Sequence, residues 1–326
     1  MTELFVVSGA GGVGKTTSST ALALAFARRQ LKTLLVTVDP ARRLADVVEQ
    51  PLEDTIVTHD TEPMLSLWMP STSAELSRIS QETMTPEDYR AFEANRVTKL
   101  FHVAPAGLHE AACALSLGQV ASDYDVVVVD TAPFEHSRSF VQSPARLRRL
   151  LEGNALTLFA AFGSGRGFGQ RIIERMLDRV MPAEVIAEGA DFFRSILKVR
   201  HELARRAAQV EALLTDARHV VVAAPTEVGV QCAQLLRRRL EPGALKNHGS
   251  GSYRKTTLTI LNRAVVDAST GVAADETAQA LRRLSGAYKL PVLEGSSREI
   301  VYQLSSQLAD IAEQLVSPTT RVSAAV

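Results

Sequence analysis

The sequence predicts an α/β fold, a doubly wound and mostly parallel sheet accompanied by a helical subdomain. A glycine-rich turn, G-x-x-x-x-G-K-T from Gly9 to Thr16, stands between a short apolar strand at 4–7 and a helical run. Later apolar runs at 32–38 and 125–130 end in polar residues, which is typical of strands buried on both faces of a parallel sheet. The region 147–210 has a helical pattern and no strand pattern.

The composition is that of a soluble globular protein. The chain has 326 residues, 46% hydrophobic and 22% charged, and it is long enough for one large domain with insertions or for two domains. Lys+Arg and Asp+Glu are both 36, and this balance argues against a nucleic-acid partner or binding to an anionic membrane. The start of the chain has no signal peptide pattern, and no apolar run reaches the length of a membrane span, so we expect a cytoplasmic protein.

The two cysteines give little scope for a metal or redox site. Cys113 and Cys232 lie far apart in sequence and outside any C-x-x-C motif. A disulfide framework and a self-contained zinc site are therefore not expected, and neither is an iron–sulfur cluster. Both cysteines are expected to be small buried apolar residues.

The turn between Gly9 and Thr16 has the residue types that a phosphate-binding loop requires. Glycines allow the backbone N–H groups to converge on a phosphate, and the helix that follows adds partial positive charge. Lys15 can reach the β- and γ-phosphates, and the Thr16 hydroxyl can bind Mg²⁺. We therefore expect a nucleoside triphosphate site here; the alternative is a strand–helix turn that binds nothing.

Two of the apolar strands lead into aspartates. Asp39 follows the strand at 32–38, where it can polarise a water for attack on a γ-phosphate, reach Mg²⁺ through a water, or cap a helix. Asp130 ends the strand at 125–130, the Walker B pattern of a carboxylate near Mg²⁺. Polar residues at the carboxyl ends of such strands lie where doubly wound sheets bind ligands. The sequence therefore predicts both aspartates beside the phosphate-binding loop.

The remaining elements are predicted from apolar periodicity. We expect further strands at 64–69, 219–224, 256–261 and 290–293. We expect helices over 74–82, from Pro86 to Leu100, and over 105–120, 197–214, 225–240 and 297–316. The stretch from Gly163 to Gly169 is expected to be a loop between helices, with a second phosphate site as the alternative.

Three stretches together resemble the nucleotide-site motifs of the ArsA-type ATPases: GAGGVGKTT, VDPARRLAD and DVVVVDTAPFEHS. This branch of the deviant-Walker P-loop ATPases includes the arsenite-pump ATPase and the eukaryotic factor that targets tail-anchored membrane proteins. The resemblance implies ATP as the substrate and Mg²⁺ as the cofactor. It implies a single P-loop ATPase domain over 1–317, with a helical subdomain from about 70–118 and 147–212, and a frayed tail at 318–326.

The resemblance also implies roles for individual residues. Asp39 and Lys15 would be catalytic. Asp130, Thr131, Ala132, Pro133 and His136 would belong to a switch, and Mg²⁺ would be held by Thr16 and, through water, by Asp39 and Asp130. Asn262 would read adenine, because an amide offers a donor and an acceptor together; the alternative is a loop cap. The implied nucleotide-binding residues are Gly11, Gly12, Val13, Gly14, Lys15, Thr16, Thr17, Asn262 and Pro291.

The sequence departs from the family's pattern in three places. Ala10 stands where the family usually has a lysine that reaches the partner's nucleotide across a dimer interface, and an alanine supplies no such charge. Phe134 and Glu135 replace the usual Thr-Gly. The paired cysteines of other members are absent, so neither an arsenite site nor a zinc-linked homodimer is expected. Ala10 leads to the hypothesis of a heterodimer with a paralogous ATPase that carries the lysine, beside the plain homodimer.

Three classes of function are compatible with these features. The leading one is an ATP-hydrolysing dimeric switch that transmits a conformational change to its helical subdomain and to a partner. A targeting module for a hydrophobic or membrane-protein client is the second, for which the modest apolar content of the helical region offers Met176, Met181, Phe192 and Phe193. The alternative is that these four residues pack inside the helical region. A partition- or division-site-like ATPase is the third, although the final helix carries acidic residues rather than a basic face.

Overall fold

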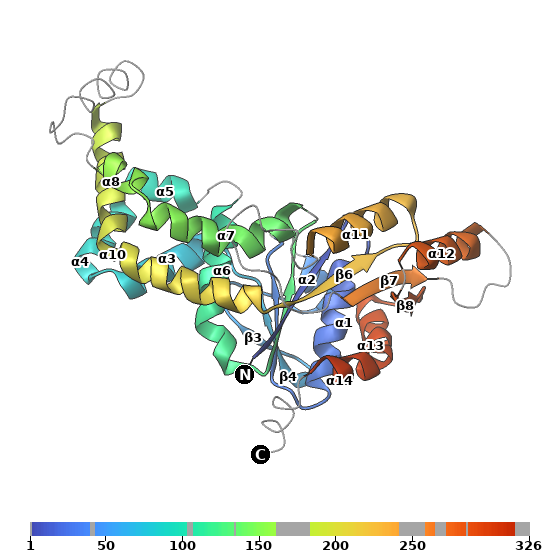
Figure 1. Cartoon of the computed structure of the whole chain (residues 1–326). Helices are drawn as coiled ribbons and strands as arrows, with labels where there is room; N and C mark the ends of the chain where they lie inside the picture. Colours follow the sequence, from blue (N-terminus) through green and yellow to red (C-terminus); the bar gives the residue numbers. More distant parts are fainter. Residues whose placement is uncertain are drawn as a thin grey trace. The chain divides into compact units, whose positions relative to one another are not determined.

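The computed structural model describes residues 2–39, 43–102, 107–133, 135–160, 183–240, 258–264, 272–284 and 286–316 (Figure 1). These residues divide into two compact units. The sheet unit is Met1–Pro70, Gly118–Val141 and Ala212–Val326, and the helical unit is Ser71–Leu117 and Gln142–Glu211. The α/β fold class with a mostly parallel sheet is confirmed.

The sheet unit is built on one sheet, with strand order β3-β4-β2-β5-β1-β6-β7-β8 in the described residues. Neighbouring strands are parallel except β3 and β4, which are antiparallel. The strands are β1 (Glu3–Gly9), β2 (Thr33–Thr37), β3 (Val57–His59), β4 (Glu62–Trp68), β5 (Val126–Asp130), β6 (Arg218–Ala223), β7 (Leu258–Ala264) and β8 (Tyr288–Pro291).

Apolar strands with few charges form the centre of this sheet. The four consecutive valines of β5, Val126 to Val129, are all fully buried, and β-branched side chains of this kind pack well on a pleated surface. Along β6 the side chains alternate between two cores: Val220 and Val222 belong to the cluster around α1, whereas Val221 and Ala223 pack with α11 and α12. Both faces of the sheet are therefore covered by helices.

Helix α1, which is buried along most of its length, packs with α2, α13 and α14, whereas α11 and α12 belong to the other core of the sheet. Helix α1 contacts β2, β4 and β5 as well as α2, α13 and α14, and the Phe26 ring lies 5.0 Å from that of Phe5. The helices are α1 (Lys15–Ala27), α2 (Arg43–Val48), α11 (Glu227–Leu240), α12 (Val272–Arg283), α13 (Ser297–Gln307) and α14 (Ala309–Leu315), with a short 3₁₀ turn at Ala121–Asp123.

The helical unit has its own apolar core, which includes Phe92, Phe192 and Leu203. An ion-pair network joins two of its helices, because the buried Arg206 of α10 contacts Glu82 of α3 at 2.7 Å and Glu202 of its own helix at 2.9 Å. Its helices are α3 (Thr72–Thr83), α4 (Pro86–Ala94), α5 (Arg96–His102) and α8 (Ala155–Ala160), together with α6 (Leu108–Val120), α7 (Glu135–Glu152) and α10 (Ala183–Thr215), which extend into the sheet unit.

Some elements differ from those that we predict from sequence. The final helix, predicted as one run over 297–316, is two helices separated at Leu308, whose ψ of −4° opens the turn while its side chain stays buried in the core. Strand β3 and helix α12 are not predicted. Strand β3 is only three residues long and partly exposed, so its apolar pattern is weak.

Several expectations fall on residues outside the described ranges. These are the loop at Gly163–Gly169, the tail at 318–326, Met176, Met181 and Phe134. Of the two cysteines, Cys113 is buried as expected, and Cys232 is half-buried. Among the helices that the structure describes, none combines the length and the apolar character that a bilayer crossing requires.

Candidate nucleotide site

The predicted phosphate-binding loop lies between β1, which ends at Gly9, and α1, which begins at Lys15. Gly12 and Gly14 have φ values of 74° and 85°, in the left-handed region that glycine adopts without strain. A Cβ atom on Gly9 would lie 2.4 Å from the carbonyl oxygen of Val222, and one on Gly14 would lie 2.1 Å from Nδ2 of Asn262. The loop can pack against β6 and β7 only because these positions have no side chain.

Lys15 closes over this loop from the first turn of α1. Its side chain is buried, and Nζ donates a hydrogen bond of 2.8 Å to the carbonyl oxygen of Ala10. Burial lowers the pKa of Lys15, and the carboxylates of Asp130 and Asp39 oppose that change by attracting the ammonium charge. One buried cation and two carboxylates therefore meet beside the loop.

Strand pairing at the centre of the sheet sets the position of Asp130. The last residue of β5 is in register with Val7 of β1 on one side and with Thr37 of β2 on the other. The register places the carboxylate at the edge where β1 leads into the loop and β2 leads to Asp39. The carboxyl ends of these three strands bring Lys15, Asp39 and Asp130 close enough for their charges to act on one another.

The carboxylate of Asp130 is buried without a hydrogen-bond partner in the part of the chain that the structure describes. It is 1% exposed, and within the described residues neither of its carboxylate oxygens has a hydrogen-bond partner. Burial raises its pKa from 3.8 to about 6, an effect that the Thr16 hydroxyl and the Lys15 ammonium oppose by their proximity. The hydroxyls of Thr16 and Ser19 both lie near Asp130 and oppose this rise in pKa, but neither forms a hydrogen bond of ordinary geometry with it. The Ser19 hydroxyl donates instead to the carbonyl oxygen of Thr16. Buried, unpartnered carboxylate oxygens are a costly feature unless a cation or donor completes them.

These side chains fit a magnesium ion. Mg²⁺ prefers hard oxygen ligands and usually keeps several waters, so it binds through one or two carboxylates together with phosphate oxygens. The carboxylate oxygens of Asp130, which have no hydrogen-bond partner among the described residues, and the hydroxyl oxygen of Thr16 are ligands of this type. They lie next to the loop that would hold the phosphates.

Asp39 is paired with an arginine to which the motifs assign no role. The Asp39 Oδ2 atom lies 3.3 Å from Nη1 of Arg43, at the start of α2, and the carboxylate is mostly buried whereas the arginine side chain is 55% exposed. The charge of Arg43 also contributes to the lowered pKa of Lys15. Arg43 lies four residues after Asp39 in the sequence, but this spacing alone does not predict the pair, because Asp39 precedes helix α2.

A cavity of about 250 Å³ adjoins the loop. Asn262 lies within β7 and donates from Nδ2 to the carbonyl oxygen of Val13 at 3.0 Å, which joins this wall of the cavity to the phosphate loop. Arg263 has a left-handed φ of 56° where the pairing of β7 with β8 is irregular. The lining includes Gly14, Thr17, Asn262, Arg263, Pro291, Val292 and Leu293. Four of these, Gly14, Thr17, Asn262 and Pro291, are among the residues that the family resemblance implies for nucleotide binding.

The predicted switch segment is placed only in part. Thr131 is buried and its hydroxyl donates to the carbonyl oxygen of Val7 at 2.7 Å, so it fastens the end of β5 to β1. Pro133 and Ala132 follow as a short connection, and helix α7 begins at Glu135. The side chain of His136 lies outside the described part of the chain.

The buried charge of Asp130 leads to a prediction about stability. The pKa of Asp130 is about 6 in the folded protein and 3.8 in the unfolded chain, so folding favours the protonated carboxyl group. The stability that this difference gives to the folded state is complete below pH 3.8 and is lost as the pH rises through about 6. We expect Asp130→Asn, which is neutral at every pH, to raise the free energy of unfolding of the nucleotide-free protein at pH 7.5 by up to roughly 3 kcal/mol, with little change at pH 4. Urea unfolding at the two pH values measures this difference.

Asp125→Asn is the matched control for this prediction. Asp125 immediately precedes the first residue of the same strand, and its Oδ2 already accepts a hydrogen bond of 2.9 Å from the backbone N–H of Lys32. Its replacement should therefore bring no gain in stability. A destabilised Asp130→Asn protein at pH 7.5 would contradict the assignment of Asp130 as a buried, uncompensated charge.

Comparisons with known proteins identify the family of this chain. Residues 2–213 match the ArsA family model, which is described as anion-transporting ATPase. A putative arsenical pump-driving ATPase of Halobacterium salinarum is 29% identical over 200 residues, covering 54% of this chain and 29% of that protein. The ATPase get3 of Aspergillus terreus is 33% identical over 149 residues, which cover 44% of each chain. A putative arsenical pump-driving ATPase 2 of Aquifex aeolicus is 27% identical over 160 residues, which cover 46% of this chain and 52% of that protein. The chain thus spans about half or less of these relatives. It belongs to the ArsA family of anion-transporting ATPases.

Proposed function

We propose that the protein is a cytoplasmic, Mg²⁺-dependent ATPase that works as a dimeric switch. The observation that carries the proposal is the convergence of Lys15, Asp39 and the unpartnered Asp130 on a phosphate-binding loop. Membership of the ArsA family supports ATP as the nucleotide, and the cavity beside Asn262 offers a place for its base.

Each side chain has a task that its position suits. The Lys15 ammonium, which now bonds a carbonyl of the loop, would transfer to the terminal phosphates of ATP. The Asp39 carboxylate would orient the attacking water and accept its proton. When bound, Mg²⁺ neutralises part of the phosphate charge; Thr16 and Asp130 are the residues that would hold it. Breaking the bond to the γ-phosphate would then change the surroundings of Asp39 and Asp130, and the change would be passed to the helical unit.

Two variants test this assignment. Lys15→Ala should weaken ATP binding and lower kcat/KM by about 100-fold or more, because it removes a cation from the phosphates. Asp39→Asn should lower kcat by roughly 100- to 10,000-fold while ATP affinity stays within a few-fold, since a water-orienting base acts on the chemical step. Phosphate release and nucleotide titration measure the two effects separately.

Lys32→Ala is the control for loss of positive charge, because Lys32 is exposed just before the amino-terminal end of β2, opposite the site. It should leave both measurements unchanged. Full turnover by the Asp39→Asn protein would defeat the role given to Asp39.

We further propose that the partner in the dimer is a paralogous ATPase that carries the lysine missing here. Ala10 lies in the loop itself and is half-buried, and its carbonyl oxygen accepts the Lys15 ammonium. An alanine offers no charge to a neighbouring subunit, so a homodimer would lack one cation at each transition state.

Ala10→Lys tests this idea within one chain. If the missing charge limits turnover, the lysine variant should hydrolyse ATP at least about tenfold faster than the original protein at equal concentration. Ala10→Met is the matched control, since it adds similar length without charge. Equal rates for all three proteins, with assembly into a homodimer, would contradict the heterodimer.

A second candidate function is the binding of hydrophobic helices from a membrane-protein client. It is favoured by large apolar side chains on the surface of the helical unit: Leu100 is 69% exposed, Leu158 is 50% exposed and Phe159 is 43% exposed. Exposed apolar side chains of this kind can contact the apolar face of a helix.

Binding of a labelled peptide with about 20 apolar residues, the length of a membrane span, tests this candidate. We expect the affinity to differ between the ATP-bound and nucleotide-free protein, because a switch must bind its client unequally in its two states. Leu100→Asp should weaken binding, whereas Val228→Asp, at an exposed apolar residue of the sheet unit, should not. Absence of binding in every nucleotide state would eliminate this function.

A further inference from the structure

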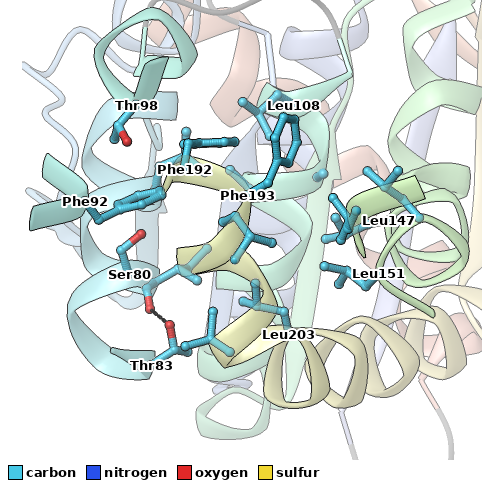
Figure 2. Close-up of a pocket in the computed structure, with 18 of the residues that line it drawn as sticks. Ser80, Thr83, Phe92, Thr98, Leu108, Leu147, Leu151, Phe192, Phe193 and Leu203 are labelled. Carbon is cyan, nitrogen blue, oxygen red and sulfur yellow. Dashed lines mark hydrogen bonds between the residues drawn. The ribbon is translucent and has the colours of Figure 1, made fainter. Parts of the chain in front are cut away.

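The helical unit surrounds a cavity of about 350 Å³ (Figure 2). Helices α3, α4, α5, α6, α7, α8 and α10 contribute to its lining. Protein interiors contain few voids larger than a water molecule, and an apolar cavity of less than half this volume is known to bind benzene. A space of this size within a well-formed core therefore has the dimensions of a ligand site.

The lining is apolar, with aromatic rings packed against one another. The Phe92 and Phe192 rings stack at 5.4 Å, and the Phe193 ring meets that of Phe192 edge-on at 5.2 Å. Among the described residues that line the cavity, none carries a charge. A ligand with a net charge would thus lose its hydration without gaining an ionic partner.

One hydroxyl in this lining lacks a partner. Thr98 of α5 is 1% exposed, and its Oγ1 makes no hydrogen bond within the described residues. Figure 2 shows this oxygen turned toward Phe92 and Phe192 on the inner side of the cavity. The Thr83 hydroxyl, by contrast, donates to the carbonyl oxygen of Ile79 at 2.8 Å. Burying a hydroxyl without a partner is unfavourable, so Thr98 marks the place where a polar atom of a ligand would bind.

The cavity also has a route to the surface. Leu150 of α7 and Phe159 of α8 both belong to its lining, yet they are 48% and 43% exposed. Side chains that are shared by the lining and the surface form a mouth, through which an apolar molecule can enter without unfolding the unit.

We propose that this cavity binds a neutral amphiphile with an apolar body and one oxygen, which forms a hydrogen bond with the Thr98 hydroxyl. At about 30 Å³ for each non-hydrogen atom, the share of a water molecule in the liquid, the space holds roughly 12 such atoms. A medium-chain alcohol has this size and polarity. The proposal does not depend on ATP hydrolysis, because every residue that it uses lies in the helical unit.

Equilibrium dialysis of the full chain against labelled 1-decanol tests the proposal. We expect saturable binding of one molecule per chain, and binding of decanoate at least tenfold weaker, because its charge has no partner in the cavity. Thr98→Val keeps the shape and removes the hydroxyl, so it should weaken decanol binding by roughly 3- to 10-fold, the effect of one hydrogen bond. Thr83→Val is the matched control and should leave the affinity unchanged, since that hydroxyl is already engaged.

Ala112→Leu provides a second line of evidence. Ala112 lines the cavity and is 1% exposed, so the larger side chain should occupy the space and abolish decanol binding. Absence of saturable binding by the unmodified protein would overturn the proposal, as would equal affinities of the Thr98→Val and Thr83→Val proteins. Saturable binding of an apolar helical peptide with no binding of decanol would assign the helical unit to a different occupant and would also overturn it.

Discussion

The nucleotide site depends on one buried carboxylate, that of Asp130 at the end of the central strand β5. Asp130 has no hydrogen-bond partner among the described residues, and it shares its surroundings with the buried ammonium of Lys15. The four valines before it fix its place, because a strand with this apolar character can lie only between two other strands under covering helices. Parallel pairing with β1 and β2 then brings the phosphate loop and Asp39 to the same edge. The electrostatic strain at Asp130 is therefore a consequence of the sheet, and relief by a bound cation is the natural complement to it.

The two units divide the chemistry between them. The sheet unit holds charged groups around a glycine loop, and its cavity beside Asn262 is joined to that loop by a hydrogen bond to Val13. The helical unit holds an apolar cavity whose lining includes the buried hydroxyl of Thr98, unpartnered within the described residues. A nucleotide would be recognised by charge and backbone dipoles, whereas a ligand of the helical unit would be recognised by apolar area and one hydrogen bond. Affinities for the two kinds of ligand can therefore be changed independently by mutation, and any coupling between them can be measured as the effect of one ligand on the binding of the other.

Much of the sheet unit could be predicted from sequence because its signals are local. A glycine loop with Lys15 between a strand and a helix, and strands that lead into Asp39 and Asp130, are patterns within a few residues of one another. Parallel pairing then makes these separate patterns meet. Strand β3 could not be found in this way, since its three residues pair in the opposite direction at an edge of the sheet.

The properties of the helical unit could be predicted much less well. Its helical character follows from the apolar periodicity of the sequence. The cavity, in contrast, is a space that side chains of several helices surround without filling it, and these helices are far apart in sequence. Nothing in the sequence around Thr98 distinguishes its hydroxyl from that of Thr83, which bonds the preceding turn of its own helix. The pair between Asp39 and Arg43 is a smaller case of the same kind, because their spacing permits the contact but the fold decides that it forms.

Titration of the purified protein with ATP, in the presence and absence of Mg²⁺, tests the central claim most directly. If Asp130 helps to hold Mg²⁺ beside the phosphates of ATP, each chain will bind one ATP, and chelation of Mg²⁺ will weaken that binding at pH 7.5. The Asp130→Asn protein will show a smaller dependence on Mg²⁺. Nucleotide binding that is indifferent to Mg²⁺ in both proteins, or no binding at all, would contradict the claim.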